Sequence, residues 1–90
     1  MAIGVIFNGM GVTEAQYRQV LNQTSPGNQP PAGMLYHAAG ASENGFCVIE
    51  VWESQAVAER FFQEQLGTAL QAAGINVQPT LFEVVNTMTA

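Results

Sequence analysis

Three side chains near the middle of the chain could support chemistry together: His37, Glu50 and Trp52. An imidazole exchanges protons near neutral pH, and a carboxylate beside it orients the ring for proton transfer. An indole next to such a pair forms an apolar wall for a flat ligand. We therefore take His37 as a candidate acid or base, Glu50 as its partner and Trp52 as a candidate binding residue. The alternative is structural: a solvated edge-strand histidine, a glutamate at a dimer rim and a core tryptophan.

Whether these three residues meet depends on the hairpin between the two strands that carry them. Asn44-Gly45 is a strong signal for a two-residue turn. With that turn, His37 lies opposite Trp52 and diagonal to Glu50, whereas a four-residue loop places His37 directly opposite Glu50. A three-residue loop sends His37 to the other face of the sheet. Two of these three turns gather the three side chains on one face.

The order of predicted elements defines the fold class. Apolar runs, helix caps and glycine or proline breaks predict a strand, a helix, two strands, a helix and a final strand, at 2–8, 13–24, 34–41, 46–52, 55–73 and 77–85. This βαββαβ order is that of the ferredoxin-like split βαβ, an α+β fold. It places two helices on one face of a four-stranded antiparallel sheet whose first and third strands are central. We expect one domain, residues 1–90.

Local signals mark the ends of these elements. Thr13 with Gln16 has the spacing of a capping box, and Ser54 is a natural N-cap. Gly67 is expected to loosen or break the second helix, and Gly74 to end it. The loop 25–33, rich in proline and glycine, is long for a small domain and is expected to cover something.

Neither central strand alternates apolar with polar residues. Val48 and Ile49 are neighbours in strand 46–52, so they face opposite sides of the sheet, yet both are apolar. The first strand has the same property. Because two helices can cover only one face, the other needs a second cover, and another copy of the chain is the simplest one. The sequence therefore predicts a homodimer.

Composition narrows the range of partners. The chain has 48% hydrophobic and 10% charged residues, with a net charge of -5 from two arginines and seven acidic residues. This balance argues against nucleic acid and against anionic membrane surfaces. No apolar run reaches the length of a membrane span. A lone Cys47 and the absence of any Cys or His cluster argue against disulfides and metal sites, so we expect a cytoplasmic protein.

Several stretches resemble a known superfamily. The segments VIEVWESQAVAERFFQEQLGTAL (48–70), GMLYHAAG (33–40) and AAGINVQPTLFEV (72–84), in this element order, resemble the dimeric α+β barrel superfamily and, within it, the antibiotic biosynthesis monooxygenase-like proteins. That superfamily includes oxygenases, isomerases, decarboxylating enzymes and haem-degrading proteins. The resemblance implies a dimeric α+β barrel and leaves the chemistry open.

The resemblance also suggests site residues. In haem-degrading relatives an asparagine near the end of the first strand serves the site, which makes Asn8 a candidate here. Tyr17 and Phe61, on the apolar stripes of the two helices, are candidates for lining a pocket, with core packing as the alternative. The expected function is that of a small cofactor-independent oxygenase or isomerase acting on a small apolar cyclic metabolite. The alternatives are a non-catalytic ligand-binding module and a purely structural dimer.

Haem degradation is not expected. In relatives that perform it, the second helix carries a catalytic tryptophan and, about three turns later, the histidine that binds iron. Counted from the tryptophan that closes the third strand, those positions hold Phe61 and Gln71 here. An amide does not replace imidazole as an iron ligand. We therefore expect no haem and no other cofactor.

Overall fold

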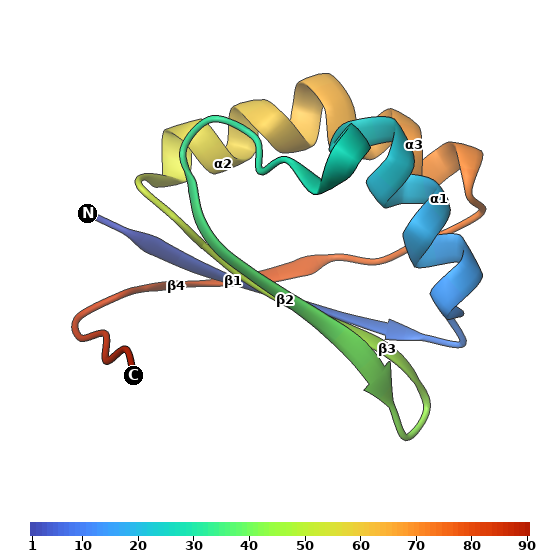
Figure 1. The fold of residues 1–90 in the computed structure, drawn as a ribbon, viewed down its shortest axis with the longest axis horizontal. Helices are drawn as coiled ribbons and strands as arrows, with labels where there is room; N and C mark the ends of the chain where they lie inside the picture. Colours follow the sequence, from blue (N-terminus) through green and yellow to red (C-terminus); the bar gives the residue numbers. More distant parts are fainter.

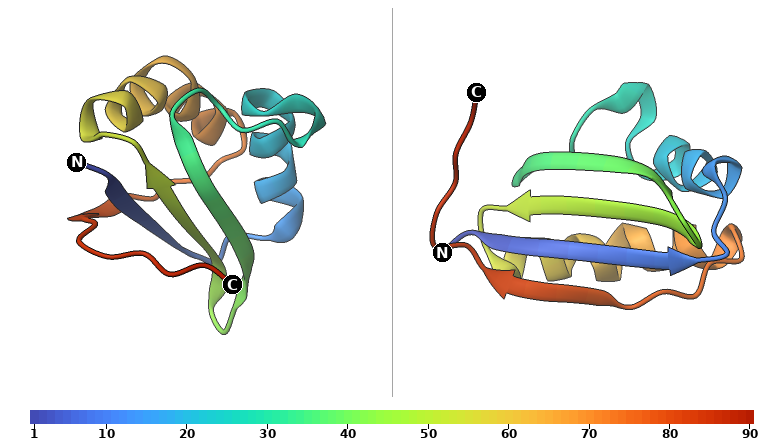
Figure 2. Two further views of the ribbon diagram at one scale, coloured as in Figure 1. Left: turned by 60° about the vertical axis from the view of Figure 1, so that its left-hand side comes forward. Right: turned by 90° about the horizontal axis from the view of Figure 1, so that it is seen from below.

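The computed structural model describes residues 1–90 and shows one antiparallel sheet with all of its helices on one side (Figures 1 and 2). The order of the strands in the sheet is β2-β3-β1-β4, so β1 and β3 are central. This arrangement confirms the ferredoxin-like α+β fold. The elements are β1 (Ile3–Met10), α1 (Glu14–Thr24), the 3-10 turn η1 (Pro26–Asn28), β2 (Met34–Ser42), β3 (Gly45–Trp52), α2 (Gln55–Phe61), the π-helical turn η2 (Phe62–Leu66), α3 (Gly67–Ala72) and β4 (Pro79–Glu83).

Both predicted helix starts are confirmed. The backbone N–H of Gln16 donates to Thr13 Oγ1 at 3.2 Å, and the backbone N–H of Thr13 donates to Gln16 Oε1 at 3.0 Å, which completes the capping box. Ser54 Oγ accepts from the backbone N–H of Val57 at 3.2 Å. These caps are local interactions, so they can be predicted from spacing alone.

The second helical region is continuous from α2 through η2 to α3, so of the two effects expected of Gly67, loosening or breaking the helix, a break does not occur (Figure 1). Instead, the N–H of Gly67 donates to the carbonyl of Phe62, five residues back, which closes a π turn. The turn holds one residue more than an α-helical turn and so changes the direction of the side chains that follow. Gly74, with φ of 72°, follows the end of the helix as predicted.

The hairpin turn differs from the prediction by one residue. Ser42 pairs with Gly45, so the turn consists of Glu43 and Asn44 rather than Asn44-Gly45. Neither Asn44 nor Gly45 has the positive φ that a type I′ turn requires. Gly45 instead belongs to β3, where a Cβ atom would collide with the carbonyl oxygen of Gly9. The close approach of β1 to β3, and not the turn, therefore requires a glycine at this position.

Two strands also differ in length from the prediction. β1 continues to Met10 instead of ending at residue 8, because its last residues still pair with the start of β3. β4 covers only Pro79–Glu83 instead of 77–85. Its partner β1 begins at Ile3, which pairs with Glu83, and strand pairing ends there.

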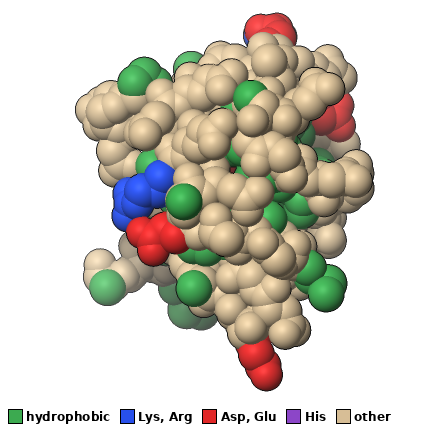
Figure 3. All heavy atoms as spheres, turned by 90° about the vertical axis from the view of Figure 1, so that its right-hand side faces the viewer, with side chains coloured by type: hydrophobic (Ala, Val, Ile, Leu, Met, Phe, Trp, Pro, Cys, Tyr) green, Lys and Arg blue, Asp and Glu red, His purple; other side chains and the backbone are tan.

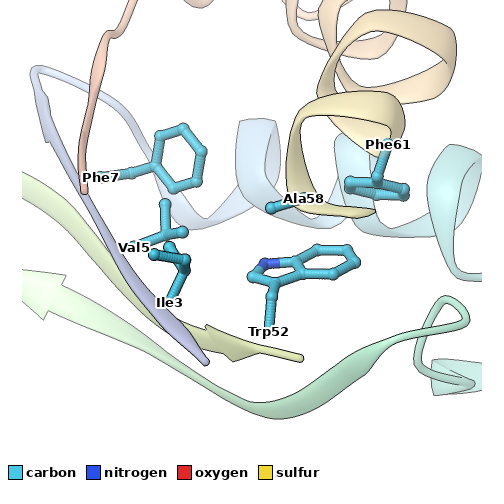
Figure 4. Close-up of a cluster of buried hydrophobic side chains, with 6 residues drawn as sticks. All are labelled: Ile3, Val5, Phe7, Trp52, Ala58 and Phe61. Atoms are coloured by element: carbon cyan, nitrogen blue, oxygen red, sulfur yellow. The ribbon is translucent and has the colours of Figure 1, made fainter. Parts of the chain in front are cut away.

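The hydrophobic core lies between the sheet and the helices. Figure 4 shows its buried side chains, with those of β1 and Trp52 of β3 pointing towards Ala58 and Phe61 of the helix. None of the helices has both the length and the apolar character that crossing a membrane requires. The six core residues are Ile3, Val5, Phe7, Trp52, Ala58 and Phe61.

The opposite face of the sheet is open and carries no charged side chain. We call it the open face. Its centre is occupied by Ile49 and Ile6, which pair across β3 and β1 and are 46% and 36% exposed. The strand register assigns the following residues to this face: Tyr36, Val51, Gly4, Phe82, Ala38, Ile49, Ile6, Thr80, Gly40, Cys47 and Asn8.

Candidate active site

The hairpin register places His37 directly opposite Glu50 on the face that the helices cover. The Nδ1 atom of His37 lies 3.1 Å from Glu50 Oε2, and Trp52 Nε1 donates to Glu50 Oε1 at 2.9 Å. The three residues singled out from the sequence are therefore joined in one hydrogen-bonded cluster. The shift of the turn by one residue kept them together, because it moved the pairing by two positions and so preserved the face of each side chain.

Tyr17 extends this cluster from the opposite side of the core. Its hydroxyl lies 2.8 Å from His37 Nε2, and its ring stacks on Phe46 with centroids 4.9 Å apart. The sequence placed Tyr17 on the apolar stripe of the first helix but did not predict its bond to His37. The only available signal was a phenol on an otherwise apolar stripe, because a buried phenol hydroxyl usually finds a hydrogen-bond partner.

The capacity of each group to donate or accept a hydrogen bond decides how the protons are distributed along this chain of four residues. Trp52 is fully buried and Glu50 is 6% exposed, while the side chain of His37 is 26% exposed. Indole N–H can only donate, so Glu50 is the acceptor for Trp52. Glu50 accepts from His37 as well when its carboxylate is ionised, which assigns the proton of neutral His37 to Nδ1. The Nε2 atom is then an acceptor, and the hydroxyl of Tyr17 donates to it.

The pKa of Tyr17 is raised above its ordinary value, chiefly because burial disfavours the phenolate. The Arg18 guanidinium acts in the opposite direction, and the Glu50 carboxylate adds to the rise. Tyr17 therefore remains a hydrogen-bond donor across the neutral range.

A cavity of about 340 Å³ lies next to the Tyr17–His37–Glu50 chain, between the sheet and the helices. Most of its wall is apolar, and no lysine or arginine lines it. Phe61, Leu66 and Leu70 contribute to the wall from α2, η2 and α3. On the face that Figure 3 shows, apolar side chains are visible near the centre, while charged groups lie towards the edges.

The loop after α1 forms another wall of this cavity. Ser25, Asn28, Gln29, Pro30 and Pro31 all line it, in agreement with the expectation that the long loop covers something. Ser25 is buried, and a 3-10 turn begins at the next residue. The loop lies between α1 and β2 in the chain and forms this side of the cavity.

The remaining sequence candidates occupy different places. Phe61 lines the cavity, whereas Trp52 does not and lies behind Glu50, against Phe61 at a centroid distance of 5.2 Å. Asn8 is exposed on the open face, where it pairs with Cys47, and is therefore separated from the cavity by the sheet. No group of three or more His, Cys, Asp or Glu side chains is arranged to hold a metal ion.

Comparison with known proteins shows the fold. No family model matches the chain, and no curated protein matches it. Among solved structures, the chain is similar over 99% of its length to 98% of a proposed antibiotic biosynthesis monooxygenase from Chloroflexus aurantiacus, with a TM-score of 0.73 and 14% identity. A proposed antibiotic biosynthesis monooxygenase from Deinococcus radiodurans gives 0.67 at 15% identity, over 100% of this chain and 98% of that one.

A third similar structure has a stated activity. It is SnoaB, a cofactor-independent oxygenase from Streptomyces nogalater, which matches with a TM-score of 0.63 at 20% identity, over 99% of this chain and 97% of that chain. At these identities the similarity concerns the fold. The chain has the fold of the antibiotic biosynthesis monooxygenase-like proteins, as the sequence resemblance predicted.

Proposed function

We propose that this protein is a small homodimeric, cofactor-independent oxygenase or isomerase that acts on an uncharged, small apolar cyclic metabolite. The observation that carries the proposal is the His37–Glu50 pair, hydrogen-bonded at 3.1 Å beside an apolar cavity of about 340 Å³. Histidine supplies the acid or base, and Glu50, itself fixed by Trp52, orients it. The stated activity of SnoaB, which has the same fold, is of the same kind.

The lining of the cavity supports an uncharged ligand. An anionic group placed in it would find no lysine or arginine to pair with, and the net charge of -5 adds repulsion. A cationic group would find only Glu50, both of whose oxygens already accept hydrogen bonds. A compact ring system with one polar end suits the cavity, since such pockets combine apolar walls with a few polar groups.

The chemistry requires little from the protein beyond a base. Removal of a proton from the carbon beside a carbonyl group, or from a phenolic hydroxyl group, produces a delocalised anion that dioxygen can oxidise or that can be reprotonated at another carbon. The first route is that of an oxygenase with dioxygen as oxidant, and the second is that of an isomerase. His37 would act in both.

Homodimer formation is part of the proposal. The open face is apolar and uncharged, so two copies could meet there without repulsion at the contact. We also expect the cytoplasm as the compartment, because a single cysteine on the open face suits reducing conditions.

The test is a panel of uncharged cyclic ketones and phenols, each incubated with the protein in air and followed by oxygen uptake and mass spectrometry. Oxygen uptake with added oxygen mass identifies an oxygenase, and a product of unchanged mass identifies an isomerase. The matched variant His37→Gln should lower the rate by about 10²–10⁴-fold. Compounds that bind without turnover would instead favour the non-catalytic binding module, and an unchanged rate in His37→Gln would remove His37 from the reaction.

A further inference from the structure

We propose that Tyr17, rather than His37, is the residue that exchanges a proton with the ligand, and that His37 and Glu50 receive this proton behind it. This inference rests on the proposed function of the same site, and it concerns which atom meets the ligand.

Both ring nitrogens of His37 are already engaged. Nδ1 lies 3.1 Å from Glu50 Oε2, and Nε2 lies 2.8 Å from the hydroxyl of Tyr17. An imidazole has no third site at which it could take a proton. A ligand in the cavity can thus reach the basic lone pair of His37 only by displacing Tyr17 or by way of it. The hydroxyl offers the second path, because it both donates and accepts.

The position of Tyr17 supports the same role. Its ring stacks on Phe46 at a centroid distance of 4.9 Å, and its hydroxyl meets the edge of the His37 ring, whose centroid lies 6.0 Å away. It lines the inner cavity and also a second, outer pocket formed with Glu14, Arg18 and 38–41. The Tyr17–His37 pair therefore lies between the cavity and the outer pocket. A proton that leaves the ligand could pass to solvent on the outer side, which repeated turnover by a base requires.

The transfer balances without any further reactant. The ligand begins as a neutral acid, Tyr17 as a phenol, His37 as a neutral imidazole and Glu50 as a carboxylate. The ligand gives its proton to the oxygen of Tyr17 while the original phenol proton moves to His37 Nε2. The result is a ligand anion, an unchanged phenol, an imidazolium and an unchanged carboxylate. Return of a proton along the same path regenerates the starting state.

The charged groups around this chain are compatible with the transfer. Glu50 faces the imidazole from β3 and stabilises it when it becomes positive. On α1 itself, the Arg18 guanidinium bonds to Glu14 at 3.1 Å on the exposed side. The renewed phenol of Tyr17 is then free to donate a hydrogen bond to the oxygen of the ligand anion, which a bare imidazolium tied to Tyr17 could not do.

The first test needs no ligand and uses nitrogen-15 NMR of the imidazole at mildly alkaline pH. His37 is the only histidine of the chain, so the spectrum contains one ring. We expect the proton on Nδ1 and none on Nε2, and we expect Tyr17→Phe to shift the Nε2 resonance while Nδ1 stays protonated. A proton on Nε2 in the native protein, or an Nε2 resonance that ignores Tyr17→Phe, would overturn the proposed chain.

The second test uses two neutral probes of similar shape, 2-naphthol and 2-methylnaphthalene. The native protein should prefer the hydroxylated probe by about tenfold, the scale of one net hydrogen bond. Tyr17→Phe should abolish this preference while the methyl probe binds as before. The control is Thr68→Val, which removes a hydroxyl from the exposed side of α3 and should keep the preference.

The outcomes separate this inference from the proposed function. A preference for 2-naphthol that survives in Tyr17→Phe means that His37 meets the ligand directly, which rejects the role of Tyr17 and leaves the site in place. Failure of both probes to bind the native protein would count against the cavity itself and against both proposals.

Discussion

At the scale of single residues, Glu50 explains why a strand as apolar as β3 retains a carboxylate. Its two oxygens accept from Trp52 Nε1 and bond to His37 Nδ1, so no buried polar side-chain atom of the protein lacks a partner. The indole that the sequence suggested as a ligand wall instead holds this carboxylate in place. Glu50 thus connects the core to the candidate base, and its two partners make separate predictions possible.

Replacing Glu50 should separate its structural contribution from its chemical one. Glu50→Ala leaves the N–H of Trp52 buried without an acceptor, which should lower the free energy of unfolding by about 1–3 kcal/mol. Glu50→Gln keeps an acceptor oxygen for Trp52 and should cost less, yet it should change the Nδ1 resonance of His37. Urea unfolding and NMR measure the two effects. Equal stability of the two variants, or an unchanged Nδ1 resonance in Glu50→Gln, would contradict this account.

The raised pKa of Tyr17 makes stability depend on pH in the alkaline range. Below the unfolded pKa, near 10.0, the neutral phenol contributes its full stabilisation, and this contribution is lost as pH rises through the higher folded pKa. In Tyr36→Phe only Tyr17 remains, and its phenolate absorbance should appear above pH 10.0. Tyr17→Phe should lose less stability than the native protein over this range. Titration of Tyr17 at or below the ordinary value would show that burial does not control it.

At the scale of elements, the β2–β3 hairpin sets the geometry of the site. Its register puts His37 opposite Glu50, and that register depends on a turn at Glu43 and Asn44. The N–H of Gly11 also donates to the carbonyl of Asn44 at 2.8 Å, which ties the turn to the end of β1. The hairpin is therefore anchored by the end of β1 as well as by the pairing of β2 with β3.

Gly45 should be intolerant of a side chain for this reason. In Gly45→Ala the new methyl group collides with backbone atoms of Gly9 and Gly11, which cannot rotate away, so we expect a loss of about 1–3 kcal/mol in the free energy of unfolding. The matched variant is Gly40→Ala on β2, where a Cβ atom meets nothing within 4 Å. Its effect should stay within about 0.5 kcal/mol. Denaturant unfolding compares the two, and equal effects would contradict the close approach.

The helical region α2–η2–α3 leads to a negative prediction about haem. Phe61 is a buried wall of the cavity, and Gln71 lies on the exposed side of α3. Neither offers iron a ligand, and the only imidazole is already bonded on both nitrogens. Titration with haemin should therefore give no sharp Soret shift at one haem per chain. Such a shift, followed by its loss and by release of iron after addition of a reductant, would show that the site had been misread.

At the scale of the whole molecule, the two faces of the sheet differ in how far they are buried. One is buried under the helices and carries the candidate site, and the other, the open face, is apolar and exposed in a single chain. A stable interface buries about 1,200–2,000 Å² in total, and a second copy placed on this sheet is the occupant that we propose. The site would then lie within each protomer, behind the interface.

Ile49, at the centre of the open face, is the position to test. It is 46% exposed in one chain, so Ile49→Asp should leave the protomer folded, while a carboxylate buried without a partner costs a dimer several kcal/mol. Light scattering should give a dimer mass for the native protein and a monomer mass for Ile49→Asp, with unchanged circular dichroism. Gln63→Asp, on the exposed side of the helix, is the control and should remain dimeric. A monomeric native protein at micromolar concentration would end the proposal.

Features that depend on neighbours along the chain could be predicted from the amino-acid sequence. The capping box at Thr13, the N-cap at Ser54 and the helix end at Gly74 are all local, as is the way successive side chains of β3 point to opposite faces, and each was predicted. Element order then restricted the topology to β2-β3-β1-β4. For two of the three possible turns the sequence predicted His37 and Glu50 on one face, and the observed register keeps them there because a shift by two residues leaves every side chain on its side.

Features that join distant segments depend on how the helices pack on the sheet, and they became visible only in the folded molecule. The hydroxyl of Tyr17 meets His37 because α1 packs over β2, and the placement of Gly45 depends on the approach of β1. Packing also sets the direction of the side chains that follow the π turn. It likewise sets the position of the loop 25–31, which forms one wall of the cavity. Such contacts depend on distances in space between elements, and these distances cannot be read from the spacing of residues along the chain. For that reason the sequence identified the candidate base and its carboxylate but not the phenol hydroxyl that is hydrogen-bonded to that imidazole.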